Sequence, residues 1–123
     1  MSEAGCIRPT LRQTFSGYQE WTAKTAVYPD AGKRTEAAVN YCIVAVGDEV
    51  GELLGKHKKF LRGDYDFEEM KKRIRSEIGD VLYEMTRLCE ELGFNLGDIA
   101  FENQDKLIDR KARGVLKGEG DNR

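Results

Sequence analysis

The sequence has little histidine, cysteine or proline, and these shortages narrow the kinds of site that it can build. Its 123 residues include one histidine, three cysteines and two prolines. The cysteines show no C-x-x-C spacing, and their odd number is unsuited to a disulfide framework. We therefore expect Cys42 and Cys89, which lie among apolar helical positions, to be small buried side chains rather than ligands or nucleophiles.

The sequence also lacks a long apolar run and an excess of either charge. The longest uncharged apolar stretch, Tyr41 to Gly47, is far shorter than the roughly 20 residues that a membrane-spanning helix needs. With 20 Lys+Arg and 22 Asp+Glu, the net charge of -2 does not favour nucleic acid or an anionic membrane as a partner. Residues 1–12 lack the pattern of a secretory signal, so we expect a cytoplasmic protein.

What the sequence does contain is helical periodicity. No segment alternates between apolar and polar residues, and apolar residues instead recur at helical spacing. We predict helices over about 11–27, 35–61, 66–92 and 95–113, with N-caps at Thr35, Asp66 and Asn95 and breaks at Pro29, at 62–64, at Gly93 and at Gly114. The predicted fold is all-α, an antiparallel bundle of about four helices. It forms a single domain over 1–123, in which 1–12 and 117–123 are flexible.

Amphipathic helices of this length cannot bury all their apolar faces within so short a chain, so we expect oligomerisation to complete the core. Gly47, Gly51 and Gly55 recur every four residues and form a stripe without side chains on the second predicted helix. Such a stripe lets another backbone approach closely. The alternative is that the glycines only make the helix easier to bend, at a cost of about 1 kcal/mol each relative to alanine.

Two pairs of acidic residues lie on the two central predicted helices. Glu49 and Glu52 are three residues apart, and Glu77 and Asp80 repeat that spacing, so each pair projects from one side of its helix. A helical wheel places both pairs at the border of an apolar stripe. Antiparallel packing of the two helices would bring the four carboxylates toward one another.

Four like charges at one place need a cation. A set of oxygen ligands without histidine or cysteine favours Mg²⁺ or Mn²⁺ over zinc, and protein-bound Mg²⁺ usually bridges carboxylates to substrate phosphates. In a chain with 34% charged residues, however, acidic pairs also arise as ordinary solvated helix faces. Glu84, one turn beyond Asp80, is either a further ligand or a surface glutamate.

The last predicted helix carries hydrogen-bond donors on one face, which are Asn103, Lys106, Arg110 and Arg113. Lysine and arginine side chains suit phosphate oxygens. Asn103 falls between apolar residues of the same helix, so we expect its amide to bond a buried backbone group or a ligand. The alternative for the cations is a solvated helix end that interacts favourably with the helix dipole.

Short motifs follow one another in order along most of the chain. They are Tyr18-Gln19, Thr25-Ala26-Val27-Tyr28-Pro29, Gly47-Asp-Glu-Val-Gly-Glu-Leu53, Ser76-Glu-Ile-Gly-Asp-Val-Leu-Tyr83, Leu92-Gly93, Asn103-Gln-Asp-Lys-Leu107, Arg113-Gly114 and Gly118-Glu-Gly-Asp-Asn-Arg123. In this combination the chain resembles the MazG-like nucleotide pyrophosphohydrolases of the all-α NTP pyrophosphatase superfamily. Asp48 departs from the pattern, because many relatives carry a glutamate there.

The resemblance implies that Glu49, Glu52, Glu77 and Asp80 are catalytic and bind Mg²⁺, for which Mn²⁺ can substitute. It also implies that Asn103, Lys106, Arg110 and Arg113 contact the substrate. The predicted reaction converts a (d)NTP and water into the (d)NMP and pyrophosphate, as in house-cleaning of the nucleotide pool. The family assembles as dimers or as tetramers made of two dimers, so we expect a homodimer or homotetramer with active sites near the subunit contacts.

Two other hypotheses stay open at this point. One is a non-catalytic helical module that binds a protein partner through its glycine stripe and charged faces. The other is a nucleotide sensor or toxin–antitoxin accessory that binds without turnover. The base preference is not indicated, since Phe15, Tyr18, Trp21 and Tyr28 would either stack on a base or lie in the core.

Overall fold

The computed structural model describes residues 14–121, and every regular element in that range is helical. The bounds of the elements are α2 Phe15–Thr22, η1 Ala23–Thr25, α3 Glu36–Leu61, α4 Phe67–Glu91 and α5 Leu96–Ala112. The described residues contain no strand, so the predicted all-α class is confirmed. None of the described helices combines the length and the apolar character needed to cross a bilayer.

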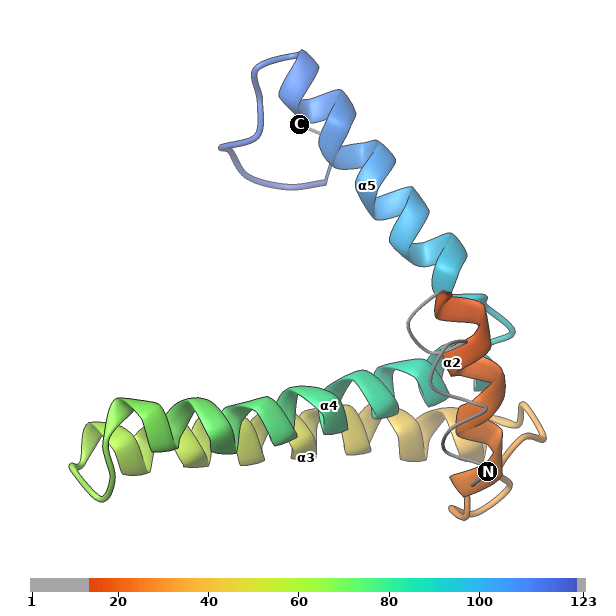
Figure 1. Cartoon of the computed structure of the whole chain (residues 1–123). Coiled ribbons are helices and arrows are strands. Elements are labelled where there is room, and N and C mark those ends of the chain that lie inside the picture. Colours follow the sequence, from red (N-terminus) through yellow and green to blue (C-terminus); the bar gives the residue numbers. More distant parts are fainter. Residues whose placement is uncertain (1–13, 122–123) are drawn as a thin grey trace, which may run out of the picture.

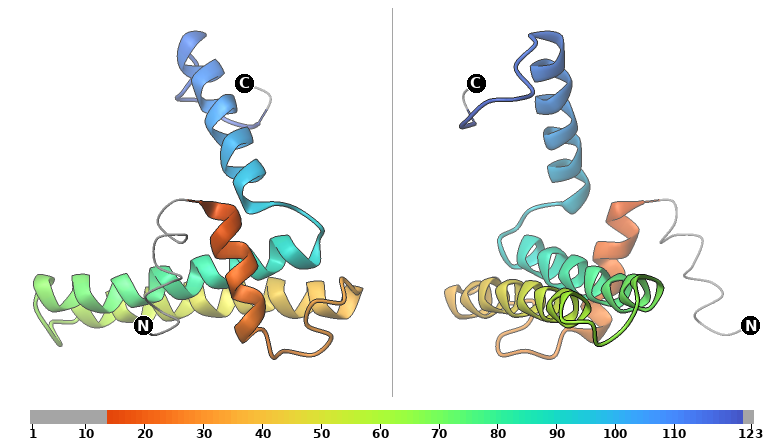
Figure 2. Two further views of the ribbon diagram at one scale, coloured as in Figure 1. Left: turned by 45° about the vertical axis from the view of Figure 1, so that its right-hand side comes forward. Right: turned by 90° about the vertical axis from the view of Figure 1, so that its left-hand side faces the viewer.

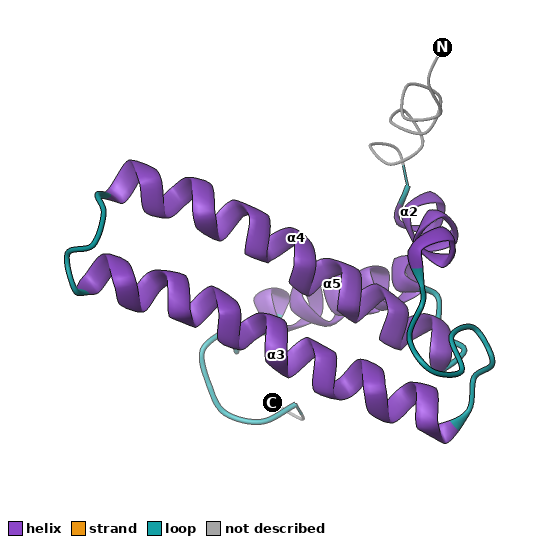
Figure 3. Ribbon diagram, turned by 90° about the horizontal axis from the view of Figure 1, so that it is seen from below, coloured by secondary structure: helices purple, strands orange, loops and turns teal. Residues whose placement is uncertain are grey.

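Helices α3 and α4 form a long antiparallel pair that makes up the body of the molecule (Figure 1, Figure 3). Both begin at their predicted N-caps. The Thr35 hydroxyl accepts a hydrogen bond from the Ala38 amide at 3.2 Å, and the Asp66 carboxylate accepts one from the Glu69 amide at 2.9 Å. The turn between the helices passes through Gly63 at φ +89°, a conformation that glycine adopts without steric cost.

Helices α2 and α5 meet near the C-terminal end of α4, and α5 then projects away from the α3/α4 pair (Figure 1, Figure 2). Asn95 is the N-cap of α5 as predicted, and its side chain accepts a hydrogen bond from the Asp98 amide at 3.1 Å. The first turn is anchored by the Leu96 amide, which donates to Gln19 Oε1 at 2.7 Å. Residues 101–109 are exposed one after another, so this stretch of α5 has no buried face among the described residues.

The first helix is shorter than its sequence pattern predicts. We expect a helix from about residue 11 to Val27, but α2 ends at Thr22 and η1 ends at Thr25. Threonine hydroxyls donate to main-chain oxygens here, from Thr22 to Gln19 at 2.7 Å and from Thr25 to Thr22 at 3.2 Å. Such bonds compete with a continued helix. Residues 11–13 of the predicted helix lie outside the described residues.

A buried carboxylate holds the loop between η1 and α3 against α4. Glu91 is 2% exposed and accepts hydrogen bonds from the backbone amides of Gly32 at 2.8 Å and Arg34 at 2.9 Å, and from the Tyr28 hydroxyl. Burial raises the pKa of Glu91, but these hydrogen bonds and the nearby Arg87 outweigh that effect, so its pKa is lowered. Glu91 is therefore ionised at neutral pH and fixes the loop.

The buried apolar core of the single chain is small. Cys42 and Cys89 are buried as predicted, at 0% and 5% exposure. The other buried apolar side chains among the described residues are Ala38, Met70 and Leu96. Large apolar side chains are exposed on every α-helix of the described chain. Examples are Phe15 of α2, Ile43, Val50 and Leu54 of α3, Ile78, Leu82 and Met85 of α4, and Phe101 and Ile108 of α5. The helices thus leave amphipathic faces uncovered in one chain, rather than closing into a four-helix bundle.

The predicted glycine stripe faces open space in the single chain. A side-chain carbon added at Gly47, Gly51 or Gly55 would meet no atom of another part of the described chain within 4 Å. Helix α4 contacts α3 on the side of the buried Cys42, which lies near Glu84, Arg87 and Glu91 of α4. Close approach of a backbone from another copy stays a prediction.

After α5 the chain turns at Gly114, whose φ of +72° suits glycine. Residues 115–121 then curve back alongside α5 (Figure 1, Figure 2). Of the segments that we predict to be flexible, 1–12 and 122–123 lie outside the described residues.

Candidate functional site

Three carboxylates from the middle of the α3/α4 pair lie close together. Glu49 of α3 and Glu77 and Asp80 of α4 each offer one oxygen, and these oxygens all lie within 4.8 Å of one another. Glu49 and Glu77 are half-buried and Asp80 is exposed. The antiparallel packing therefore brings together three of the four carboxylates that the sequence pairs. We call these three residues the acidic cluster.

The fourth predicted carboxylate, Glu52, is exposed and lies outside the acidic cluster. A step of three residues rotates a side chain by about 300°, or 60° short of a full turn, and moves it about 4.5 Å along the helix. In α3 this rotation carries Glu52 out toward solvent, whereas Glu49 points toward α4. The two side chains thus leave neighbouring parts of the α3 surface, but only Glu49 has an oxygen in the acidic cluster.

The acidic cluster is electrostatically unfavourable as it stands. Burial raises the pKa of Glu49, and the carboxylates of Asp80, Asp48, Glu77 and Glu84 raise it further. Asp48, the position at which the chain departs from the MazG-like pattern, therefore adds negative charge to the same place. Nearby like charges that are not balanced by a cation indicate a site that binds one.

Glu84 gives a second, independent indication of a cation. Its Oε2 atom is buried and has no hydrogen-bond partner among the described residues. Burial raises the pKa of Glu84, Arg87 lowers it, and Asp80 and Asp48 raise it. A buried carboxylate oxygen without a partner is costly. Because every group around it on the cluster side is a hard oxygen ligand, the residues present fit Mg²⁺ or Mn²⁺.

Tyr18 of α2 lies near the acidic cluster and stacks with Trp21 of the same helix. The rings of Tyr18 and Trp21 are stacked with centroids 6.4 Å apart. Burial raises the pKa of Tyr18, with further contributions from Tyr83 and Asp80, which places the Tyr18 hydroxyl near the cluster. Thr25 donates to the Tyr83 hydroxyl at 2.9 Å, so the end of η1 is tied to the same region of α4.

The predicted donors on α5 lie in a different part of the single chain. Asp80 is roughly 16 Å of helix from the end of α4, and Lys106 is roughly 15 Å up α5 from Leu96, at 1.5 Å per residue. The two helices diverge from their junction (Figure 1). The fold of one chain therefore does not bring the donor face and the acidic cluster together.

The donors of α5 differ in their surroundings. Asn103, whose amide we expect to bond a buried backbone group or a ligand, is exposed in the described chain. Lys106 and Arg110 both contact Asp121, at 3.5 Å each, and Arg113 contacts Asp109 at 2.9 Å. The partner that we expect for the Asn103 amide therefore stays a prediction.

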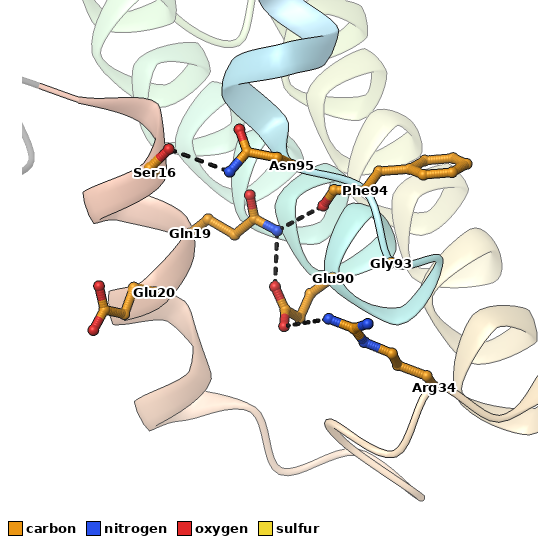
Figure 4. A pocket seen from close by; sticks show the side chains of 8 residues that line it. All are labelled: Ser16, Gln19, Glu20, Arg34, Glu90, Gly93, Phe94 and Asn95. Atoms are coloured by element: carbon orange, nitrogen blue, oxygen red, sulfur yellow. Dashed lines mark hydrogen bonds and ion pairs between the residues drawn. The ribbon is translucent and has the colours of Figure 1, made fainter.

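A pocket of about 410 Å³ lies between α2 and the turn that joins α4 to α5 (Figure 4). Several of the side chains that line it are bonded to one another (Figure 4). Gln19 Nε2 donates to Glu90 Oε2 at 2.8 Å and to the Phe94 oxygen at 2.9 Å, Arg34 is 3.6 Å from Glu90, and Asn95 donates to Ser16 at 3.2 Å. These bonds fix α2 to the start of α5, and none of the predicted site residues lines the pocket.

Sequence reasoning misses a buried charged network in α4. Arg87 donates to the Tyr28 hydroxyl at 3.2 Å and to Thr22 at 3.3 Å, and lies 3.7 Å from Glu91. The side chains of Arg87 and Glu91 are 1% and 0% exposed. The only signal in the sequence is their i,i+4 spacing, which is equally typical of solvated helix faces.

Comparison with known proteins adds a family and one relative. Residues 40–115 match the family model described as the MazG nucleotide pyrophosphohydrolase domain, a range that includes the acidic cluster and the donors of α5. The chain is also 36% identical over 110 residues to the Gene 37 protein of Mycobacterium phage L5, covering 86% of this chain and 96% of that protein. No solved structure matches the chain.

Proposed function

Because the chain belongs to the MazG nucleotide pyrophosphohydrolase family, we propose that it hydrolyses nucleoside triphosphates to monophosphates and pyrophosphate in a Mg²⁺-dependent reaction. The observation that carries this proposal is the acidic cluster, where Glu49, Glu77 and Asp80 place three carboxylate oxygens within 4.8 Å of one another. The family match supports the nucleotide chemistry, and the cluster supports the metal.

The chain's own residues have distinct roles in this proposal. Glu49, Glu77 and Asp80 would hold Mg²⁺, and the buried oxygen of Glu84 would either join them or orient the attacking water. The exposed Glu52 completes the set from the solvent side. When bound, Mg²⁺ polarises the phosphates and offsets charge on the leaving pyrophosphate. Tyr18 and Trp21 offer an aromatic face beside the cluster on which a base can stack.

The test is an assay of standard and damaged (d)NTPs with Mg²⁺ or with EDTA, in which pyrophosphate and orthophosphate are resolved. Mg²⁺-dependent release of pyrophosphate is expected, together with the nucleoside monophosphate. Orthophosphate as the product would contradict cleavage between the α- and β-phosphates. Mg²⁺-dependent binding of a nucleotide without any product would instead identify a nucleotide sensor.

We also propose that the protein works as a homodimer or as a tetramer of two dimers. The uncovered stretch 101–109 of α5 includes Phe101 at 67% and Ile108 at 59% exposure. Helices without a packed face are marginal in water, so α5 needs a partner. The exposed apolar side chains Ile43, Val50 and Leu54 of α3 need one as well. A second copy provides apolar faces of the same kind for both.

Such an assembly could also place the donors of α5 from one copy next to the acidic cluster of another copy. We propose that Asn103, Lys106, Arg110 and Arg113 of one copy contact the phosphate or sugar of a nucleotide held at the acidic cluster of another copy. The support is the outward path of α5, whose donors lie far from the cluster of their own chain (Figure 1).

Mixing two inactive variants tests the shared site. Asp80→Asn removes a cluster carboxylate, and Lys106→Ala with Arg110→Ala removes the donors. After unfolding and refolding together, the two chains should recover about a quarter of wild-type activity, because half of the random dimers hold one intact site of two. Light scattering checks that each variant still assembles. Dimers that form without recovering activity would show that each site lies within a single chain.

A further inference from the structure

The two cations on α5 that are proposed to bind phosphate already hold an anion, and it belongs to the same chain. Asp121 Oδ1 lies 3.5 Å from Lys106 Nζ and 3.5 Å from an Arg110 guanidinium nitrogen, which also donates to the Asp121 backbone oxygen at 2.9 Å. A carboxylate and a phosphate offer the same kind of oxygen to lysine and arginine. Asp121 thus makes the kind of contact with Lys106 and Arg110 that a phosphate oxygen would make.

The returning tail covers one of the two cations. The chain reverses after Gly114, the Val115 amide donates to the Arg110 backbone oxygen at 2.9 Å, and the Arg110 side chain is left only 5% exposed. The Asp121 side chain is itself 88% exposed. The contact of Asp121 with the two cations is therefore made through charge at a solvent-exposed position.

Asp121 is well suited to compete with phosphate at neutral pH. Lys106 and then Arg110 lower its pKa, so the carboxylate stays ionised. Ion pairs with an exposed partner are individually weak. Such a contact closes the site without preventing a stronger anion from opening it.

We propose that the tail is a built-in competitor, whose Asp121 carboxylate covers Lys106 and Arg110 until the phosphate chain of a nucleotide or of pyrophosphate displaces it. The identity of that ligand rests on the proposed function. The anion competition itself rests only on the contacts of Lys106, Arg110 and Asp121.

The size of the effect follows from the strength of the contact. Two weak ion pairs favour the closed tail by a factor of roughly 3 to 10, and the apparent affinity of a competing anion is reduced by the same factor. Removing the Asp121 carboxylate should therefore tighten binding of a phosphate chain by about fivefold.

The experiment measures binding by titration calorimetry for the full chain, Asp121→Ala and a control, Glu119→Ala. Glu119 is an exposed acid of the same tail, so its removal changes the net charge equally. The probes are inorganic tripolyphosphate, pyrophosphate and an NTP with a non-hydrolysable α,β-imido link. Asp121→Ala should tighten all three by about fivefold, while Glu119→Ala leaves them close to wild type.

Three results would overturn the inference. They are unchanged or weaker binding in Asp121→Ala, an equal gain in Glu119→Ala, and a gain for the NTP analogue alone, which would mean that the tail obstructs the base or sugar. Binding of tripolyphosphate needs no turnover, so this outcome is independent of the proposed reaction. The two proposals can therefore fail separately. If the wild-type protein releases no pyrophosphate but Asp121→Ala binds tripolyphosphate more tightly than wild type, the proposed reaction is refuted and the proposed competition by Asp121 stands.

Discussion

Helix α4 carries two charged regions that differ in how their charges are balanced. Near its end, Arg87 and Glu91 are almost fully buried, and Glu91 accepts hydrogen bonds from the loop before α3 at 2.8 and 2.9 Å. In its middle, Glu77 and Asp80 meet Glu49, and the neighbouring charges raise the Glu49 pKa. The first region is satisfied by the chain itself, whereas the second is not.

The difference separates a structural role from a binding role on one helix. Buried charges are tolerated when each is paired and hydrogen-bonded, and the Arg87 network meets that condition. The acidic cluster gathers like charges beside an unpartnered buried oxygen of Glu84. It therefore has the character of a site completed by a ligand. Substitutions in the two regions should affect different properties.

The largest expected effect is the loss of activity in Asp80→Asn or Glu77→Gln. Losing a metal ligand should lower kcat/KM by about 10³-fold, equal to roughly 4 kcal/mol of transition-state stabilisation. The metal-free protein should be as stable as wild type or more stable, because a like charge has been removed. Pyrophosphate release and urea unfolding measure the two properties.

Glu68→Gln is the matched control, since Glu68 is an exposed acid of α4 paired only with Lys71, at 3.3 Å. It should keep wild-type activity. If the cluster variants retain activity, or if their metal-free form unfolds more easily than wild type, the cluster is structural and the contrast between the two regions disappears.

Breaking the buried network of Arg87 and Glu91 should reduce the free energy of unfolding by about as many kcal/mol as the cluster variants lose in transition-state stabilisation. Arg87→Met leaves the Glu91 carboxylate buried without its cation, which should lower the free energy of unfolding by about 3–5 kcal/mol. The measurement is urea unfolding followed by circular dichroism. Lys71→Met removes an exposed ion pair in the same helix and should cost less than about 1 kcal/mol. If the two variants lower the free energy of unfolding equally, the buried pair stabilises the fold no more than an exposed pair does.

A smaller effect concerns pH. The pKa of Glu49 and that of Glu84 are both raised above the ordinary glutamate value of 4.5, so both groups favour the folded metal-free protein when protonated. Their contribution is present below the unfolded pKa and is lost as pH rises through the folded pKa. Acidification from pH 7 should therefore recover stability without metal and weaken Mg²⁺ binding.

Thermal melting between pH 7.5 and pH 5 tests this, with Mg²⁺ and with EDTA. The difference in Tm between the two conditions should shrink as the pH falls. Glu91 does not interfere in this range, because its lowered pKa means that its stabilising contribution is lost only at more acidic pH. A Tm difference that stays constant would show that Glu49 and Glu84 take no part in binding the metal.

The sequence predicts local features of the fold well. Thr35, Asp66 and Asn95 are N-caps in the structure, because a cap depends on a side chain and amides only two or three residues away. The breaks at Gly93 and Gly114 coincide with positive φ values, which depend on local sterics. The i,i+3 pairs likewise depend on local helix geometry, and they include all three carboxylates of the acidic cluster.

Features that depend on packing between elements could not be read in this way. A helical wheel gives Asn103 apolar neighbours on α5, but it does not show that α5 lacks a packing partner in its own chain. For the same reason, the spacing of Glu49 and Glu52 does not show that Glu52 is exposed and lies outside the acidic cluster. The contact of Asp121 with Lys106 forms because the chain reverses after α5. A helical pattern in the sequence cannot predict such a contact.

The loop before α3 shows one further consequence of Glu91. Asp30 and Arg34 adopt φ values of 60° and 57°, which cost a non-glycine residue about 1 kcal/mol or more. Glu91 accepts hydrogen bonds from the backbone amides of Gly32 and Arg34, so a residue of another helix helps to hold the loop in this shape. The path of the loop therefore depends in part on Glu91, although Glu91 lies 59 residues from Gly32 and 57 residues from Arg34 in the sequence. A substitution of Glu91 is expected to disturb the start of α3 as well as the end of α4.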